Sequence, residues 1–256
     1  MRKDRRVEIG LGMASSDDVR WYISIPLAKD YDNLAYCGRQ RQCAQPIEYD
    51  TQEIGSLRGK SSFVLTDVAE LAGLGTHEVI AKSGVSEYPI QIAVRRDDTY
   101  VGYATELIGV PFVYVPKQTP DGHQTDLRKG ADCVALVVYG RRRTDRSVRY
   151  VAPKKLHDTL DKIGDRATLA TTDIREGDVL HFGFQTALIA EDREPRGKLD
   201  GNDIILHTYH GRAELRPFSE LPYGKLRFDI LRWGGKEEQV PKGSERSATS
   251  GREAQE

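Results

Sequence analysis

The chain has 256 residues, a net charge of −1, 38% hydrophobic residues and 30% charged residues. This length fits one large domain or two modest ones, and the composition is that of a soluble globular protein. The near-zero net charge gives no global basic field for nucleic acid. No apolar run approaches the ~20 residues that a membrane span requires. We therefore expect no nucleic-acid partner and no membrane span.

The beginning of the chain bears on the compartment. The first six residues are basic, but no apolar segment follows them, so the sequence contains no recognisable secretory signal. Two alternatives remain open. The protein is cytoplasmic, or it is a periplasmic or cell-envelope protein whose export signal precedes the sequence given.

The sequence contains three cysteines. Cys37 and Cys43 enclose a short loop, and they either form a disulfide in an oxidising compartment or remain two free thiols. They lack the C-x-x-C spacing and the second ligand cluster of a zinc site, so we expect no metal and no organic cofactor. Cys133 is left over, which makes it the candidate for a reactive thiol.

Residues 1–96 predict a small, mostly-β accessory module. Residues 1–15 form an irregular start, and residues 67–73 fit one or two helical turns that end at a glycine. The remaining pattern alternates apolar and polar residues and is rich in strand formers. Strands are expected at residues 20–27, 33–37, 46–49, 61–66, 77–81 and 89–94.

Residues 97–233 predict a domain of a different kind, and residues 234–256 predict a disordered polar tail. Three helices come first, at residues 100–108, from residue 133 to about residue 140, and at residues 153–163. An antiparallel run of strands follows at residues 179–182, 186–190, 203–209 and 228–233. Helices followed by an antiparallel sheet indicate an α+β fold.

The second helix carries the principal candidate site residue. Asp132 is a favourable N-cap because its carboxylate accepts the free amide protons of the first turn. Cys133 then lies at the positive end of the helix, where a thiol pKa is lowered and the nucleophilic thiolate is favoured. The alternative is an inert, buried cysteine in a core helix.

Four segments in order resemble the NlpC-type family of bacterial cell-wall cysteine peptidases. Residues 103–114 resemble the family's opening helix and its G-x-P-Y-x-W/Y turn, and residues 132–137 resemble its D-C-S-G-L-V nucleophile helix. Residues 176–182 resemble its P-G-D-L-x-F-F strand entry, and residues 205–208 resemble its F-I-H-A strand. The match covers about residues 97–233, so the accessory module lies outside it.

The resemblance implies a papain-like fold and hydrolysis of peptide bonds in peptidoglycan stem peptides. Cys133 matches the nucleophile, which forms a thioacyl-enzyme that water releases. His207 matches the third, orienting group of the site. Asp132, Phe112 and Tyr114 match positions beside the nucleophile and are expected to contact substrate.

The family's proton-accepting histidine is replaced in this chain, because Gln185 stands at the expected position and glutamine cannot accept a proton at neutral pH. Phe112 likewise replaces a tyrosine whose hydroxyl usually lies near the nucleophile. Two hypotheses follow. His181, His207 or His210 serves as the base of a rearranged cysteine hydrolase, or the domain binds a cell-wall fragment or a protein partner without cutting it.

Overall fold

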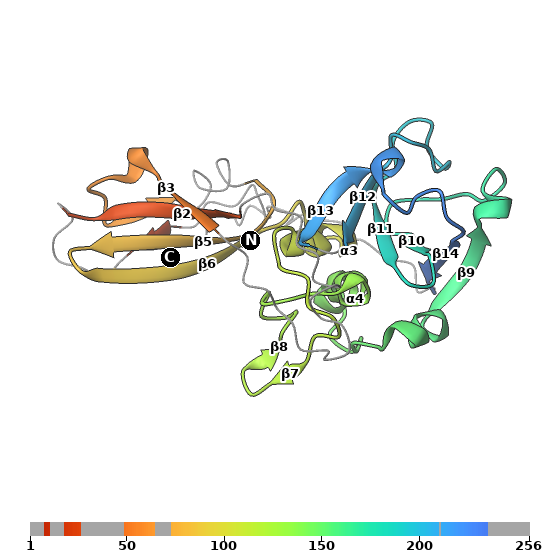
Figure 1. Ribbon diagram of the computed structural model, residues 1–256, viewed down its shortest axis with the longest axis horizontal. Helices are drawn as coiled ribbons and strands as arrows, with labels where there is room; N and C mark the ends of the chain where they lie inside the picture. Colours follow the sequence, from red (N-terminus) through yellow and green to blue (C-terminus); the bar gives the residue numbers. More distant parts are fainter. Residues whose placement is uncertain (1–7, 11–17, 27–48, 65–72, 210, 235–256) are drawn as a thin grey trace, which may run out of the picture.

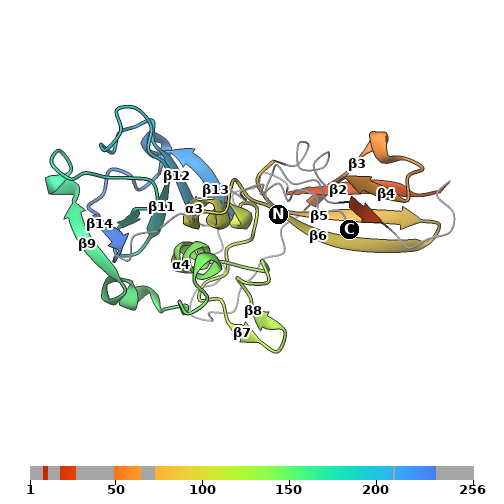
Figure 2. The same ribbon diagram turned by 180° about the vertical axis from the view of Figure 1, so that it is seen from behind.

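A computed structural model describes residues 8–10, 18–26, 49–64, 73–209 and 211–234. The strands expected at residues 33–37, the turn at residues 67–72, Cys37, Cys43, His210 and the tail from residue 235 lie outside these ranges. The chain forms two lobes, one mainly of strands with the 3₁₀ turn η1 (Gly55–Leu57) and one that combines helices with a larger sheet (Figures 1 and 2). The mixture of helix and sheet expected from the sequence is confirmed.

The first lobe contains a four-stranded antiparallel sheet in the order β3-β2-β5-β6. Trp21 and Phe63 meet edge to face in its core, with ring centroids 4.7 Å apart. Residues 8–10, expected to be irregular, form a short strand paired with residues 62–64. The strands of this lobe are β1 (Glu8–Gly10), β2 (Arg20–Pro26), β3 (Tyr49–Glu53), β4 (Ser62–Val64), β5 (Gly75–Ser83) and β6 (Ser86–Val94).

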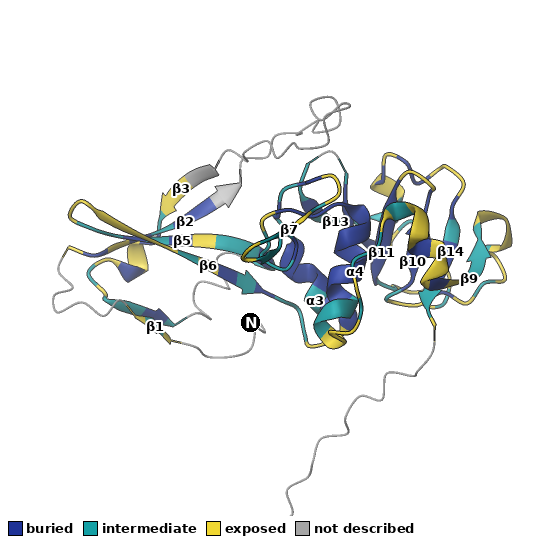
Figure 3. Ribbon diagram, turned by 90° about the horizontal axis from the view of Figure 1, so that it is seen from below, coloured by how far each residue is buried: buried dark blue, intermediate teal, exposed yellow. Residues whose placement is uncertain are grey.

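The second lobe begins with two packed helices, α3 (Tyr100–Ala104) and α4 (Cys133–Thr144). Both are mostly buried (Figure 3). Gly140 allows their close approach, because a Cβ there would lie 2.5 Å from the carbonyl oxygen of Tyr100. The 3₁₀ turn η2 (Thr105–Leu107) completes the first expected helix. Among the described residues, no helix is long and apolar enough to cross a membrane.

A buried carboxylate fixes the far end of α4. Glu106 is 1% exposed and accepts hydrogen bonds from Arg143 of α4 at 3.1 Å, from Arg95 at 3.0 Å and from the hydroxyl of Tyr139 at 2.5 Å. Because Arg95 directly follows β6, the same carboxylate connects the first lobe to the cysteine helix. A buried charge with several partners of this kind is costly to break.

The second lobe is built on a six-stranded sheet in the order β13-β12-β11-β10-β14-β9. A separate two-stranded antiparallel sheet pairs β7 (Gln118–Thr119) with β8 (Gly122–His123). The six strands are β9 (Leu160–Asp165), β10 (Val179–His181), β11 (Thr186–Glu191), β12 (Ile204–Thr208), β13 (Ala213–Pro217) and β14 (Asp229–Trp233).

One expected helix is wrong. Residues 153–163 form the 3₁₀ turn η3 (Pro153–Asp158) and then enter β9, which pairs with β14. The local helical pattern is overridden by this long-range pairing, which also buries Leu160. Strand β13, which the sequence pattern did not predict, forms by pairing with β12.

The two faces of the six-stranded sheet bury different clusters, since side chains alternate along each strand. The face toward α4, which we call the helix face, carries Val179, Leu188, Leu206 and Leu231 in one core with α4. The opposite face, which we call the outer face, carries Leu180, Ala187, Ile205 and Ile230 in a second core. The latter core is closed by loop residues that include Phe182, Leu221, Tyr223 and Phe228.

Candidate active site

The start of α4 follows the expectation from the sequence. Asp132 has an extended backbone, and its Oδ1 accepts the N–H of Ala135 at 2.7 Å, so it is the N-cap of the helix. Its Oδ2 accepts the N–H of Val115 at 3.0 Å. Asp132 therefore fixes the first turn of α4 and also holds the preceding loop against it.

Cys133 is a free, buried thiol with 9% of its surface exposed. Burial raises its pKa to about 12, and the negative charge of Asp132 acts in the same direction. The N–H and the hydroxyl of Thr186 on β11 lie against the sulfur and lower the pKa by less than burial raises it. Among the described residues, no imidazole is hydrogen-bonded to this sulfur. The thiol is consequently protonated in the free protein at neutral pH.

A row of polar side chains crosses the end of the helix face. His181 on β10 lies directly opposite Thr186 on β11 and directly opposite Asp229 on β14. Residues that face each other across antiparallel strands project from the same side of a sheet. Nδ1 of His181 is 3.0 Å from the hydroxyl oxygen of Thr186. The row thus continues from Cys133 through Thr186 to a histidine and an aspartate.

The position of this row depends on how β10 and β14 are held together. Asp178, immediately before β10, is fully buried and accepts two hydrogen bonds from the guanidinium of Arg232, at 2.6 and 2.7 Å. Such a bidentate contact fixes both distance and orientation. Gly183, with φ +83°, then allows the tight turn into β11. These contacts set the register that aligns His181 with its two neighbours.

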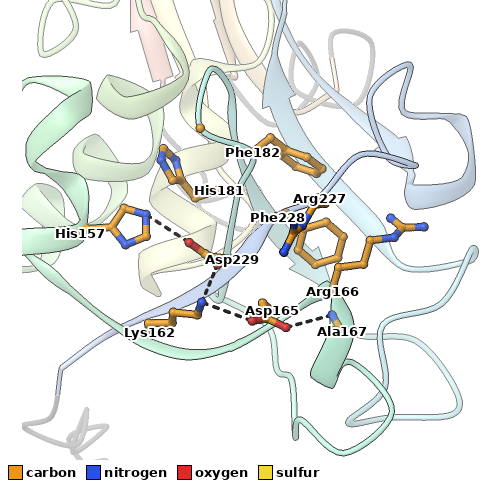
Figure 4. A pocket seen from close by; sticks show the side chains of 11 residues that line it. His157, Lys162, Asp165, Arg166, Ala167, His181, Phe182, Arg227, Phe228 and Asp229 are labelled. Atoms are coloured by element: carbon orange, nitrogen blue, oxygen red, sulfur yellow. Dashed lines mark hydrogen bonds and ion pairs between the residues drawn. The ribbon is translucent and has the colours of Figure 1, made fainter.

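A cavity of about 380 Å³ is lined in part by His181 and does not include Cys133 among its lining residues. His157, Lys162 and Asp229 line it together with His181 (Figure 4). The rings of His157 and His181 meet edge to face, with centroids 4.8 Å apart. Lys162 pairs with Asp229 at 2.7 Å. Burial lowers the pKa of His181, His157 lowers it further, and Asp229 raises it.

Gln185 and His207 lie together on the outer face of the sheet. Gln185 donates to the carbonyl oxygen of Thr208 at 2.8 Å and to the hydroxyl of Tyr223 at 3.4 Å. Nδ1 of His207 is 2.9 Å from the same hydroxyl. Burial lowers the pKa of His207 to about 4, and the charge of Arg216 adds to that effect. Gln185 and His207, both expected in the site, therefore contact the same hydroxyl of Tyr223 on the outer face.

The side chain against Cys133 is that of Thr186, one residue after Gln185, which was expected to stand beside the thiol. The physical reason is strand alternation, since a shift of one residue moves a side chain to the other face of the sheet. Counting the alternation back from Leu188 indicates Thr186. The positions of Asp229 and His157 beside His181 depend on strand pairing that no local signal reveals.

The segment before α4 lies beside the cysteine helix. Phe112 is buried and forms a bridge with Ala131, while Tyr114 is 39% exposed. Val115 has φ +53°, an unfavourable value for a β-branched residue. The hydrogen bond from its N–H to Asp132 compensates part of this strain. Phe112 therefore supports the loop, whereas Tyr114 is available at the surface.

The described residues contain no group of three or more His, Cys, Asp or Glu side chains arranged to hold a metal ion. Comparisons with family models, with curated proteins and with solved structures find no match for this chain.

Proposed function

We propose that the chain is a cysteine hydrolase of peptide or amide bonds, with Cys133 as nucleophile and His181 as proton acceptor. The observation that carries this proposal is the 3.0 Å contact between Nδ1 of His181 and the hydroxyl of Thr186. Thr186 in turn lies against the sulfur. A hydroxyl can accept one proton while it donates another. Thr186 thus connects the thiol to a base that does not touch it.

The proposed reaction balances at each step. The thiol proton passes to Oγ1 of Thr186, while the hydroxyl proton of Thr186 passes to Nδ1 of His181. The sulfur attacks the carbonyl carbon, and the leaving nitrogen takes a proton from His181 as its bond to carbon breaks. Water then attacks the thioester and gives one proton to His181. As the carbon–sulfur bond breaks, that proton passes back through Thr186 to the sulfur, so that a carboxylic acid leaves and the thiol is restored.

The electrostatics of the row suit these roles. Burial lowers the pKa of His181, which keeps its imidazole neutral near pH 7 and able to accept a proton. Asp229 stabilises the imidazolium that forms, as the acid of a catalytic triad does. Because the pKa of Cys133 is about 12, proton removal has to accompany attack on the substrate.

The finer fold and the substrate rest on the resemblance to NlpC-type peptidases. A cysteine in the first turn of a buried helix, packed against an antiparallel sheet, supports a papain-like arrangement. In this proposal the base has moved from the start of β11 to the neighbouring strand β10. The substrate is then a peptide bond in the stem peptides of peptidoglycan.

The direct test is digestion of purified peptidoglycan. Wild-type protein should release products with new amine ends, identified by mass spectrometry, whereas Cys133→Ala and His181→Ala should not. The matched control is His207→Asn, which changes the histidine on the outer face. If Cys133→Ala released these products at the wild-type rate, Cys133 would not be the nucleophile.

A second candidate is a binding domain that no longer cuts. The specific observation in its favour is that Cys133 is 9% exposed, with a threonine rather than an imidazole against its sulfur. Retention of the protein on peptidoglycan without new amine ends, equal for wild type and Cys133→Ala, supports this candidate over the hydrolase.

A further inference from the structure

His157 stands beside the proposed base but comes from a different element. It lies in η3, just before β9, and its ring meets the edge of the His181 ring at a centroid distance of 4.8 Å. Its Nε2 is 3.6 Å from Oδ2 of Asp229, the residue directly opposite His181. Figure 4 shows Asp229 joined to His157 and to Lys162, so the carboxylate opposite His181 in the strand pairing is engaged by residues of η3 and β9.

The charged neighbours of His181 come from every element packed around it. Asp229 approaches from β14, His157 from η3, and Lys162 and Asp165 from β9, while Cys133 and Thr186 lie toward α4 and β11. Lys162 holds both carboxylates, Asp229 at 2.7 Å and Asp165 at 3.3 Å. Arg166 and Arg227 line the same cavity, so cationic side chains flank these two carboxylates.

Two adjacent imidazoles resist holding two positive charges at once, since like charges disfavour ionisation. His157 is exposed and nearer to solvent, whereas His181 is buried. Oδ2 of Asp229 lies 3.6 Å from Nε2 of this exposed ring, so the carboxylate opposite His181 is engaged by His157.

We propose that His157 is a positioning residue, which engages Asp229 and leaves the His181 imidazole neutral and turned toward Thr186. Its meaning for catalysis rests on the proposed function, but the coupling between the two rings does not. His157 would keep the base ready at a mildly acidic pH, at which an unassisted histidine beside an aspartate would already be protonated.

The test is a titration of the full chain by NMR, following the ring Cε1–H signals of the histidines. The His181 signal is assigned from its loss in His181→Gln. His157→Asn removes the charge and the ring, and His157→Phe keeps an aromatic ring at the same edge contact. Lys154→Gln is the matched control, because it removes a positive charge from the same turn outside the cavity.

We expect the titration midpoint of His181 to rise in both His157 variants and to stay at the wild-type value in Lys154→Gln. A midpoint that is unchanged or lower in both variants overturns the proposal. A rise in His157→Asn alone also overturns it, because packing rather than charge would then be responsible. The readout needs no turnover, so an inactive wild type would count against the hydrolase and not against this coupling.

Discussion

The two faces of the six-stranded sheet each carry a buried histidine at the same end, but the two histidines have opposite surroundings. His181 on the helix face shares a row with Thr186 and borders a cavity. His207 on the outer face is 2% exposed and is hydrogen-bonded to Tyr223. The face of the sheet that a histidine occupies therefore determines whether it lies in the row that begins at Cys133.

The same comparison separates two kinds of buried polar group. On the outer face, the contacts of Gln185, Tyr223 and His207 satisfy one another and stabilise the core. On the helix face, the row ends at a thiol whose contact with Thr186 leaves its proton in place. The first arrangement is suited to structure and the second to proton transfer.

The largest expected effect is on the rate of peptidoglycan cleavage, when His181 and His207 are replaced one at a time. His181→Ala should slow the release of new amine ends from peptidoglycan by about 10²- to 10⁴-fold, the usual contribution of a general base. His207→Asn should leave the rate within a few-fold of wild type. Mass spectrometry of the products measures both, and a greater loss in the His207 variant would reverse the assignment of the two faces.

A large effect on the rate is also expected from the hydroxyl of Thr186. Thr186→Val keeps the shape of the side chain but removes the group that passes the proton from Cys133 to His181, so cleavage should slow about as much as in His181→Ala, by about 10²- to 10⁴-fold. Thr186→Ser retains the hydroxyl and should stay close to wild type. If valine and serine behave alike, protons do not pass through this residue.

The next effect is a pH dependence of the free energy of unfolding, and it comes from His207 on the outer face. The pKa of His207 is about 4 in the folded protein, against 6.5 as its reference value. Between these pH values His207 is protonated in the unfolded chain but largely neutral in the folded protein. The free energy of unfolding should therefore fall as the pH drops from 6.5 to 4, by on the order of 3 kcal/mol.

Urea unfolding at pH 7 and at pH 4.5 measures this loss. The variant His207→Asn should lose less stability than wild type over the same interval, because it lacks the titrating ring. Equal losses in the two proteins would show that other groups account for the acid sensitivity.

The smallest effect belongs to Tyr223. Tyr223→Phe removes the hydroxyl that contacts His207 and should lower the free energy of unfolding by about 1 kcal/mol, the net value of a typical hydrogen bond. The rate of peptidoglycan cleavage should not change. A variant that is as stable as wild type but cleaves more slowly would connect the outer face to the reaction.

Local signals predicted the parts of the site that local chemistry controls. The N-cap Asp132 and the helix starting at Cys133 are confirmed, because capping depends on residues within one turn. The expected strands around Leu180 and Leu188 are also present, as β10 and β11. The helix continues to Thr144, beyond the expected end near residue 140.

Predictions that depended on distant residues fared differently. The helix expected over residues 153–163 gave way to η3 and β9, because pairing with β14 offers hydrogen bonds that the local pattern does not include. His157 received no functional expectation from its sequence surroundings. It became a neighbour of His181 only through that pairing.

The sequence by itself determined a capped helix that begins with a cysteine, a mixed helix-and-sheet composition and the approximate limits of the strands. Only the tertiary structure decided which side chain meets the sulfur. Strand alternation turned Gln185 and His207 to the outer face, and strand order brought Thr186, His181 and Asp229 into one row. The physical reason is that capping is a contact between near neighbours, whereas a row across a sheet depends on the register of strands far apart in the chain.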